Sequence, residues 1–268
     1  MAKPEQISSA ANPLVKAVRR AIARGSLTED GLCVAESFHL LEEALRSDCA
    51  VKTVLAAHSV QSAVEKHVRR LQGIRIAVLP DALFQSLAGT ETSQGVIALV
   101  LPPSWAIEQL FRGASLVLAL DGVQDPGNAG TMVRAAEAFG ATGVMFLKGT
   151  ASPFNPKTLR ASAGSLFRMP FVHSIDAELA LAAFKQNKLD AYAGVPCSGR
   201  NHVKSLPDAD LTRKCAVIIG SEGRGVSESL HGGATDLAIP TVGVESLNAA
   251  MAASVILYEA RRQRSLTP

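Results

Sequence analysis

The chain has 268 residues, of which 47% are hydrophobic and 19% are charged, and its formal net charge is +3. This length fits two domains of modest size, and the composition excludes a disordered or fibrous protein. No run approaches the roughly 18 uncharged apolar residues that a membrane-spanning helix requires. The first residues also lack the apolar segment of a signal peptide. We therefore expect a soluble, cytoplasmic protein.

The cysteines and histidines do not indicate a disulfide framework or a metal site. The four cysteines are Cys33, Cys49, Cys197 and Cys215, and none lies at metal-ligand spacing from another cysteine or a histidine. The six histidines form no HExxH motif. We expect the cysteines to be small buried side chains and expect no metal.

The first part of the chain alternates between helical and strand-like periods. Helices are predicted over Pro13–Arg24, Ser37–Ser47, Val60–Leu71 and Asp81–Leu87. Strands are predicted over Leu32–Ala35, Val51–Ala56, Ile74–Leu79 and Val96–Leu101. This alternation predicts a small α/β/α sandwich. Pro102 and Pro103 end the last strand, so we place a domain over 1–105 and a second over 106–268.

The first predicted helix has a basic face. Lys16, Arg20 and Arg24 recur at four-residue spacing, and no acidic residue lies between Asn12 and Arg24. Apolar residues fill another face of this helix: Leu14, Val15, Val18 and Ile22. Two interpretations stay open, a solvated helix face or a patch that binds phosphates.

The second part of the chain has stronger strands. They are predicted over Ser115–Leu120, Gly143–Leu147, Asp190–Val195, Cys215–Gly220 and Asp236–Ile239. These runs are continuously apolar, which predicts parallel strands covered by helices on both faces of a sheet. Ligands of such α/β sheets bind beyond the carboxyl ends of the strands. The loops that follow the strands are therefore the informative segments.

The loop after the first of these strands leads into an amphipathic helix. Apolar residues mark its buried stripe: Met132, Ala135, Ala136 and Phe139. Asn128 stands where a helix N-cap is expected, and Gly140 where a helix-ending glycine is expected. Arg134 lies off the buried stripe. It is either a solvated charge or, one turn beyond a glycine-rich loop, a group that meets an anion.

A second glycine-rich loop follows the strand that ends at Gly220. Gly220, Gly223 and Gly225 permit a close approach of the backbone to a ligand. Their order is GxxGxG, which disfavours the dinucleotide-binding GxGxxG turn, and the chain contains no GxxxxGK[ST] phosphate loop. Glu222 is either a charge at a helix N-terminus or a carboxylate presented to substrate.

A third loop follows Pro240 and leads to Ser246-Leu247-Asn248. No charged residue then occurs before Glu259. A helix that is apolar all round must be buried on every side, in a core or at a subunit interface. Ser246 and Asn248 are either helix caps or hydrogen-bonding groups beside a ligand.

Together, and in this order, the three loops resemble the three motifs of the SpoU (TrmH) family of SPOUT-class RNA ribose methyltransferases. The first motif is matched by Asn128, Gly130 and Arg134. The second is matched by Gly220, Glu222, Gly223 and Gly225. The third is matched by Ile239, Pro240, Ser246, Leu247 and Asn248. The resemblance covers roughly residues 114–264.

The first hundred residues resemble the substrate-binding domain that is often fused in front of this family. The segments that carry this resemblance are ISSAANPLVKAVRR and SQGVIALV, and such domains are similar to small ribosomal RNA-binding proteins. The usual Glu-Gly pair of that domain reads Glu36-Ser37 here. RNA contacts are accordingly expected from Asn12, Lys16, Arg20 and Arg24.

The resemblance implies S-adenosyl-L-methionine as methyl donor, a ribose 2′-hydroxyl of RNA as acceptor, and no metal. It also implies a deep trefoil knot and a homodimer, both built by the C-terminal domain. The cofactor would be held by Gly220, Ser221, Gly223, Ile239, Pro240 and Leu247. Asn128, Asn248 and Ser246 would orient the reacting groups, and Arg134 would hold a neighbouring phosphate and stabilise alkoxide character. Phosphate, water or Glu222 would take the proton.

We favour large-subunit (23S) ribosomal RNA as the substrate because of the fused N-terminal domain. The alternatives are a tRNA 2′-O-methyltransferase and a non-catalytic RNA-binding or ribosome assembly factor of the same fold. A nucleotide-binding oxidoreductase is disfavoured, since the GxGxxG turn and its acidic ribose-binding residue are both missing.

Overall fold

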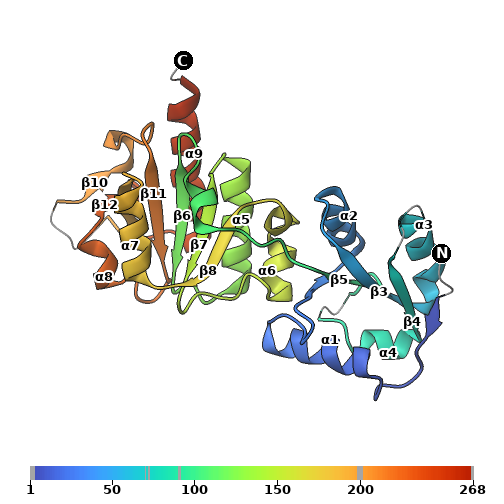
Figure 1. Cartoon of the computed structure of the whole chain (residues 1–268). Coiled ribbons are helices and arrows are strands. Elements are labelled where there is room, and N and C mark those ends of the chain that lie inside the picture. The colour runs from blue at the N-terminus through green and yellow to red at the C-terminus, as the bar shows by residue number, and fades with distance from the viewer. Residues whose placement is uncertain (1–3, 70, 72, 90–91, 198–201, 267–268) are drawn as a thin grey trace. The chain divides into compact units, whose positions relative to one another are not determined.

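A computed structural model of the chain describes residues 4–69, 71, 73–89, 92–197 and 202–266. It divides into two compact units (Figure 1). Unit 1 comprises Met1–Ser104 and Phe154–Arg168, and unit 2 comprises Trp105–Pro153 and Met169–Pro268. The predicted domains, 1–105 and 106–268, differ from these units chiefly in the segment Phe154–Arg168. That segment was expected in the C-terminal domain and packs with unit 1.

Unit 1 contains, within its described residues, a mixed five-stranded sheet in the order β1-β4-β3-β5-β2. The strands are β1 (Glu5–Gln6), β2 (Cys33–Glu36), β3 (Val51–Ala57), β4 (Arg75–Leu79) and β5 (Val96–Val100). The helices are α1 (Pro13–Arg24), α2 (Phe38–Arg46), α3 (Gln61–Val68), α4 (Asp81–Gln85) and α6 (Pro156–Ala161). Short 3-10 turns occur at His58–Val60 and Ser165–Phe167. α1 and α4 share one hydrophobic cluster with alternate residues of the strands, so these two helices cover one face of the sheet.

Helix α1 keeps the predicted bounds because its ends are well defined by the sequence. The Asn12 side chain accepts a hydrogen bond from the amide of Leu14 at 2.9 Å, and Pro13 occupies the first helical position. Gly25 ends the helix in the left-handed conformation. Val15 and Val18 are fully buried, so the helix docks by the apolar face that its spacing predicts.

The segment Phe154–Arg168 is attached to unit 1 by charge pairs. Glu36, at the end of β2, is only 2% exposed, and its Oε2 lies 3.0 Å from Nη1 of Arg160 in α6. The same oxygen accepts the amide of Gly89 at 3.2 Å. Nη1 of Arg168 likewise donates a hydrogen bond to Oε2 of Glu43 in α2. A buried carboxylate is costly unless it is paired and hydrogen-bonded, so these arginines hold the segment in place.

Ser37 stands in the glycine position of the expected Glu-Gly pair. Its φ is 140°, a region that favours glycine, and its hydroxyl accepts the amide of Leu40 at 3.1 Å. The serine therefore adopts the backbone conformation of this turn and also caps helix α2.

Unit 2 contains, in the part of the chain that is described, a seven-stranded sheet in the order β10-β12-β9-β11-β6-β7-β8. The strands are β6 (Leu116–Asp121), β7 (Gly143–Leu147), β8 (Phe171–Ile175), β9 (Asp190–Gly194), β10 (Lys204–Ser205), β11 (Cys215–Gly220) and β12 (Thr235–Ala238). Every recorded pair is parallel, which confirms the predicted parallel sheet. β8 and β10 were not predicted.

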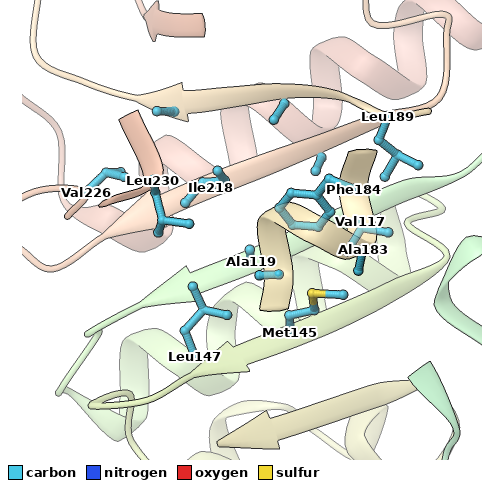
Figure 2. Packing of buried hydrophobic residues seen from close by; sticks show 14 of the residues in the cluster. Val117, Ala119, Met145, Leu147, Ala183, Phe184, Leu189, Ile218, Val226 and Leu230 are labelled. Carbon is cyan, nitrogen blue, oxygen red and sulfur yellow. The ribbon is translucent and has the colours of Figure 1, made fainter. Parts of the chain in front are cut away.

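The helices of unit 2 are α5 (Pro126–Ala138), α7 (Ala177–Gln186), α8 (Glu228–His231) and α9 (Ala249–Leu266), with 3-10 turns at Ile107–Phe111 and Leu206–Asp208. Figure 2 shows the core between the sheet and α7 and α8, where Phe184 packs near Val117 and Ile218. α9 packs against α5 and β11. Because β11 lies in register between β9 and β6, the carboxyl ends of these three strands meet at one edge of the sheet.

Helix α9 starts directly after Asn248 and is not fully covered within the single chain. It begins at Ala249, so Asn248 is its cap, one of the two caps that the sequence allows. Met251, Val255 and Tyr258 are 58%, 38% and 56% exposed, so the core of the single chain does not bury the helix on every side, and its burial at a subunit interface stays a prediction. The three residues recur at helical spacing and form one apolar stripe on the surface of unit 2.

The cysteines are all free. Burial raises the pKa of the Cys33 thiol to about 12 and that of Cys215 to about 11. Cys49 is half-buried, and Cys197 is exposed on the loop after β9, so the prediction of buried cysteines is wrong for Cys197. No group of three potential metal ligands occurs among the described residues. No helix in the same residues is long and apolar enough to cross a bilayer.

Candidate cofactor and RNA site

A cavity of about 400 Å³ lies at the carboxyl ends of β9 and β11 in unit 2. Three loops surround it, each following a strand of the parallel sheet, as expected for α/β folds. The lining residues come from the end of β9, the turn after β11, the loop after β12 and the first turns of α9: Gly194, Val195, Pro196, Ile219, Gly220, Ser221, Glu222, Gly223, Arg224, Gly225, Val226, His231, Ile239, Ser246, Leu247, Ala249, Ala252 and Ile256.

The turn after β11 is shaped by glycine. A Cβ atom on Gly220 would overlap the backbone of Gly225, whereas one on Gly223 would meet nothing within 4 Å. Two backbone hydrogen bonds close the turn: the amide of Ser221 donates to the carbonyl of Gly225 at 3.2 Å, and the reverse bond measures 2.8 Å. Gly225 has a φ of +68°. The turn therefore requires glycine at its two ends and tolerates a side chain at its tip.

Most of the predicted cofactor residues line this cavity. Gly220, Ser221, Gly223, Ile239 and Leu247 all contribute to its wall. Pro240, the sixth, is exposed and does not belong to the lining. Two predicted catalytic residues, Glu222 and Ser246, line it as well. Their roles stay predictions.

Three predicted catalytic residues form one hydrogen-bonded network beside the cavity. The Nδ2 of Asn128 donates to Oε1 of Glu222, and the Nδ2 of Asn248 donates to Oδ1 of Asn128 at 3.3 Å. The Oδ1 of Asn248 accepts the amides of Ala250 at 2.9 Å and Met251 at 3.3 Å. Asn248 is thus both the cap of α9 and a member of the network, and its amide orientation is fixed by these partners.

Asn128 is not the N-cap of α5. The helix begins at Pro126, and the cap is Asp125, whose Oδ1 accepts the amide of Asn128 at 2.6 Å. Asp125 suits the cap position because its carboxylate accepts an amide of the first turn. Pro126 suits the first helical position because it has no amide that needs a partner there. Asn128 lies within the first turn, which frees its side chain to contact Glu222 and Asn248.

Arg134 is exposed on α5, off the stripe that Met132, Val133 and Ala136 bury. In the described part of the chain, its guanidinium has no recorded hydrogen bond or ion pair. The cation is therefore available to bind an anion. This agrees with the second of the two interpretations of Arg134, a group that meets an anion.

Two parts of the site were not predicted. Gly194, Val195 and Pro196 line the cavity because β9 lies next to β11 in the sheet. Strand β9 itself was predicted, but the sequence gives no strand order, so its loop could not be assigned to this edge. His231 also lines the cavity, from the short helix α8 that follows the glycine turn. A lone histidine carries no spacing signal.

The basic face of α1 lies in unit 1. Lys16, Arg20 and Arg24 are exposed. Arg20 forms an ion pair with Glu29, with 2.5 Å between Nη1 and Oε1. Glu29 lies beyond the end of α1, outside the acid-free segment from Asn12 to Arg24. The side chains of Lys16 and Arg24 have no recorded hydrogen bond or ion pair among the described residues. Asn12 serves as the cap of α1, which leaves its predicted RNA contact a prediction.

Comparisons with known proteins agree with this architecture. Residues 115–258 match the model of the SpoU rRNA Methylase family, and residues 12–98 match that of the MRM3-like substrate binding domain. The chain is 33% identical to the "23S rRNA (guanosine(2553)-2'-O)-methyltransferase RlmP" of Bacillus subtilis (strain 168), over 96% of this chain and 99% of the relative.

Two solved structures resemble the whole chain. The SpoU methyltransferase AviRb from Streptomyces viridochromogenes, in complex with the cofactor AdoMet, has a TM-score of 0.83 and 25% identity, and covers 95% of this chain and 98% of its own. The AdoMet-bound rRNA methyltransferase from Sinorhizobium meliloti has a TM-score of 0.80 and 26% identity, with coverages of 96% and 97%.

These matches define the class of the protein, an S-adenosylmethionine-dependent RNA methyltransferase. More particularly, the chain belongs to the SpoU rRNA methylase family. The predicted family, enzyme class and cofactor are therefore confirmed.

Proposed function

We propose that the protein transfers a methyl group from S-adenosylmethionine to a ribose 2′-hydroxyl of RNA, with 23S ribosomal RNA as the preferred substrate. The observation that carries this proposal is the cavity with its glycine turn, which lies directly beside the network of Asn128, Glu222 and Asn248. The cavity offers a site for the methyl donor, and the network offers polar groups for the acceptor.

The cavity fits the donor by its chemistry. Its volume lies within the range of small-molecule sites. The glycine turn leaves main-chain amides and carbonyls open to polar groups of a nucleoside, while Ile219, Leu247 and Ile256 provide apolar walls. A Cβ on Gly220 would fill the space in which Gly225 closes the turn. We propose that Gly220, Ser221, Gly223, Ile239 and Leu247 hold the cofactor.

The chain's own residues must position the hydroxyl and increase its nucleophilicity. When bound, S-adenosylmethionine supplies an electrophilic methyl group on a sulfonium with a good leaving group. Asn128 and Asn248 present fixed amides, and Ser246 adds a hydroxyl at the cavity wall. Arg134 supplies a permanent cation that holds the neighbouring phosphate and stabilises negative charge on the reacting oxygen. It does not act as the base, because a guanidinium keeps its proton in proteins.

Glu222, a substrate phosphate or water accepts the proton of the hydroxyl. Glu222 accepts a hydrogen bond from Asn128, which holds its carboxylate at the cavity wall. If Glu222 is the acceptor, Glu222→Gln lowers kcat far more than it raises the KM for RNA. If phosphate or water is the acceptor, the variant keeps most of its kcat.

We propose that unit 2 contains a deep trefoil knot. After β12, which is separated from β11 by β9, the chain returns through residues 239–248 to α9. α9 then packs against β11 and α5. This path takes residues 239–248 past the loop that follows β11, which supports a chain threaded into a knot. Knots are rare among protein folds.

Ribosomal RNA is favoured over tRNA by a relative that aligns over nearly its full length and is named as a 23S rRNA enzyme. The basic face of α1, in the part that matches a substrate-binding domain, supports RNA binding by unit 1. We therefore expect cells that lack the protein to lose a 2′-O-methyl group from 23S rRNA, and Arg134→Ala not to restore it. A methyl group lost from tRNA instead would favour the tRNA alternative, and no loss at all would favour the non-catalytic factor.

We propose a homodimer formed through the exposed stripe of α9. Met251, Val255 and Tyr258 leave an apolar surface that a second copy would cover. The Tyr258 ring packs edge-to-face on Phe139, the residue that follows α5, with 5.7 Å between the ring centroids. Val255→Glu is expected to convert the protein to monomers, measured by analytical ultracentrifugation. The control is Leu179→Glu, which charges a similarly exposed leucine on α7. A parent that sediments as an active 28.1 kDa monomer would contradict the proposal.

A further inference from the structure

His231 is placed between two hydrogen-bond acceptors beside the cofactor cavity. It is the last residue of α8, and its side chain is only 10% exposed. Its Nδ1 lies 2.7 Å from Oδ1 of Asp236 in β12, and its Nε2 lies 3.1 Å from the carbonyl oxygen of Val226. These are the hydrogen-bond partners recorded for the ring within the described residues.

The partners determine the protonation of the ring. A carbonyl oxygen and an ionised carboxylate accept hydrogen bonds and cannot donate them. A neutral imidazole has one N–H group and could satisfy only one of the two. Both contacts are made together when Nδ1 and Nε2 each carry a proton. The geometry thus describes an imidazolium paired with the Asp236 carboxylate, with a charge-assisted hydrogen bond.

The second partner connects the ring to the cofactor turn. Val226 directly follows Gly225 and is buried in the core of unit 2. The next residue, Ser227, donates its amide to Oδ2 of Asp121 at the end of β6, at 2.7 Å. Two ionisable side chains therefore hold residues 226–227, immediately after the point where the backbone of Gly225 closes on Gly220.

We propose that His231 is doubly protonated and that, through its Nε2–H group, it is a positioning residue for the cofactor turn. It fixes the carbonyl of Val226, and through it the backbone of Gly220–Gly225 that forms the wall of the cavity. This inference rests on the proposed function, because the turn is assigned there to S-adenosylmethionine. His231 contacts no reacting atom in this account, so it affects the affinity for cofactor and leaves the chemical step alone.

Two isosteric variants separate the two contacts of the ring. His231→Gln keeps an amide donor near the position of Nε2 and so keeps the bond to Val226. His231→Asn keeps a donor near Nδ1 and so keeps only the contact with Asp236. We expect calorimetry to show an S-adenosylmethionine Kd that is about tenfold higher for His231→Asn, since a buried carbonyl loses its partner, and within about threefold of the parent for His231→Gln. The kcat at saturating cofactor should stay within about twofold for both.

The ring itself provides a readout that does not depend on cofactor. ¹⁵N NMR of the histidine side chains in the cofactor-free protein should show both ring nitrogens of His231 protonated. Asp236→Asn should remove the second proton while leaving the affinity within about threefold, because Nε2–H still reaches Val226; this variant serves if His231→Asn does not fold. A singly protonated ring in the parent, or equal affinities of His231→Asn and His231→Gln, would overturn the inference. A parent that does not bind S-adenosylmethionine would instead contradict the proposed function.

Discussion

The cofactor cavity of unit 2 and the basic face of α1 in unit 1 are built on opposite principles. The wall of the cavity depends on main chain: Gly220 has no space for a Cβ atom, and the φ of +68° at Gly225 favours glycine. The basic face consists of long, exposed side chains on an ordinary helix, and one of them, Arg20, is already paired with Glu29. A single methyl group added at Gly220 should therefore disrupt the cofactor cavity. The basic face of α1 should instead lose its affinity for RNA gradually as charges are removed.

The largest effect on cofactor binding is expected from Gly220→Ala. Its Cβ would overlap the backbone of Gly225, so the turn must open and the cavity wall is lost. We expect binding of S-adenosylmethionine to fall by at least about a hundredfold in calorimetry, the equivalent of about 2.7 kcal/mol. Gly232→Ala is the matched control, because Gly232 does not line the cavity and the same methyl group meets nothing within 4 Å there. Equal losses in the two variants would show that the turn does not define the site.

Arg134→Ala should abolish most methyl transfer without affecting cofactor binding. Loss of a charge-assisted contact made mainly in the transition state costs about 10²–10³ in rate. The cofactor Kd should stay within a few-fold, since Arg134 does not line the cavity. The measurement is a filter-binding methylation assay, with Arg112→Ala as a control that removes another exposed arginine of unit 2. Near-normal turnover of Arg134→Ala would refute its assignment.

A third change tests a buried charge of unit 1 against an exposed one. Arg160→Met removes the ion pair between Nη1 of Arg160 and the Glu36 carboxylate, which is 2% exposed. Breaking such a pair costs about 3–5 kcal/mol, whereas loss of an exposed pair costs about 1 kcal/mol or less. Arg75→Met, which breaks the exposed pair with Glu5, is the control. Hydrogen exchange of the β2 amides should report the difference, and equal protection in both variants would contradict it.

The smallest effect is expected on the basic face itself. Replacement of Lys16, Arg20 and Arg24 by Ala should weaken RNA binding and flatten its salt dependence, by about 0.7–0.9 in the log–log slope for each phosphate that the protein no longer neutralises. Because Arg20 is paired, Lys16 and Arg24 should account for most of the change. Replacement of Lys52 and Lys66 in the same unit is the control. A triple variant with the parent's slope would mean that the face is only solvated.

Much of the fold and the site could be predicted from the sequence. Apolar runs such as Gly143–Leu147 and Cys215–Gly220 gave strand bounds that the structure reproduces, because buried parallel strands have an unambiguous pattern. β8 was missed because it lies at the sheet edge, where Val172 is half-buried and His173 and Ser174 are exposed, so the segment has no continuous apolar run. The cap of α5 was placed at Asn128 instead of Asp125, since both are good cap residues.

The parts of the site that could not be predicted depend on contacts between distant residues. Glu29 neutralises Arg20 only because the chain turns back after α1. Likewise, Glu36 and Arg160 are far apart in the sequence, and nothing in the spacing of either indicates the other. His231 becomes part of the cavity only when α8 lies next to the glycine turn and β12.

The central claim is that this cavity and its polar network methylate a ribose hydroxyl of RNA. The most direct measurement incubates the purified protein with methyl-labelled S-adenosylmethionine and total RNA, digests the RNA to nucleosides, and identifies the labelled product by mass spectrometry. We predict label in a single 2′-O-methylnucleoside, and none with Arg134→Ala. Label on a base, or no label above that of Arg134→Ala, would contradict it.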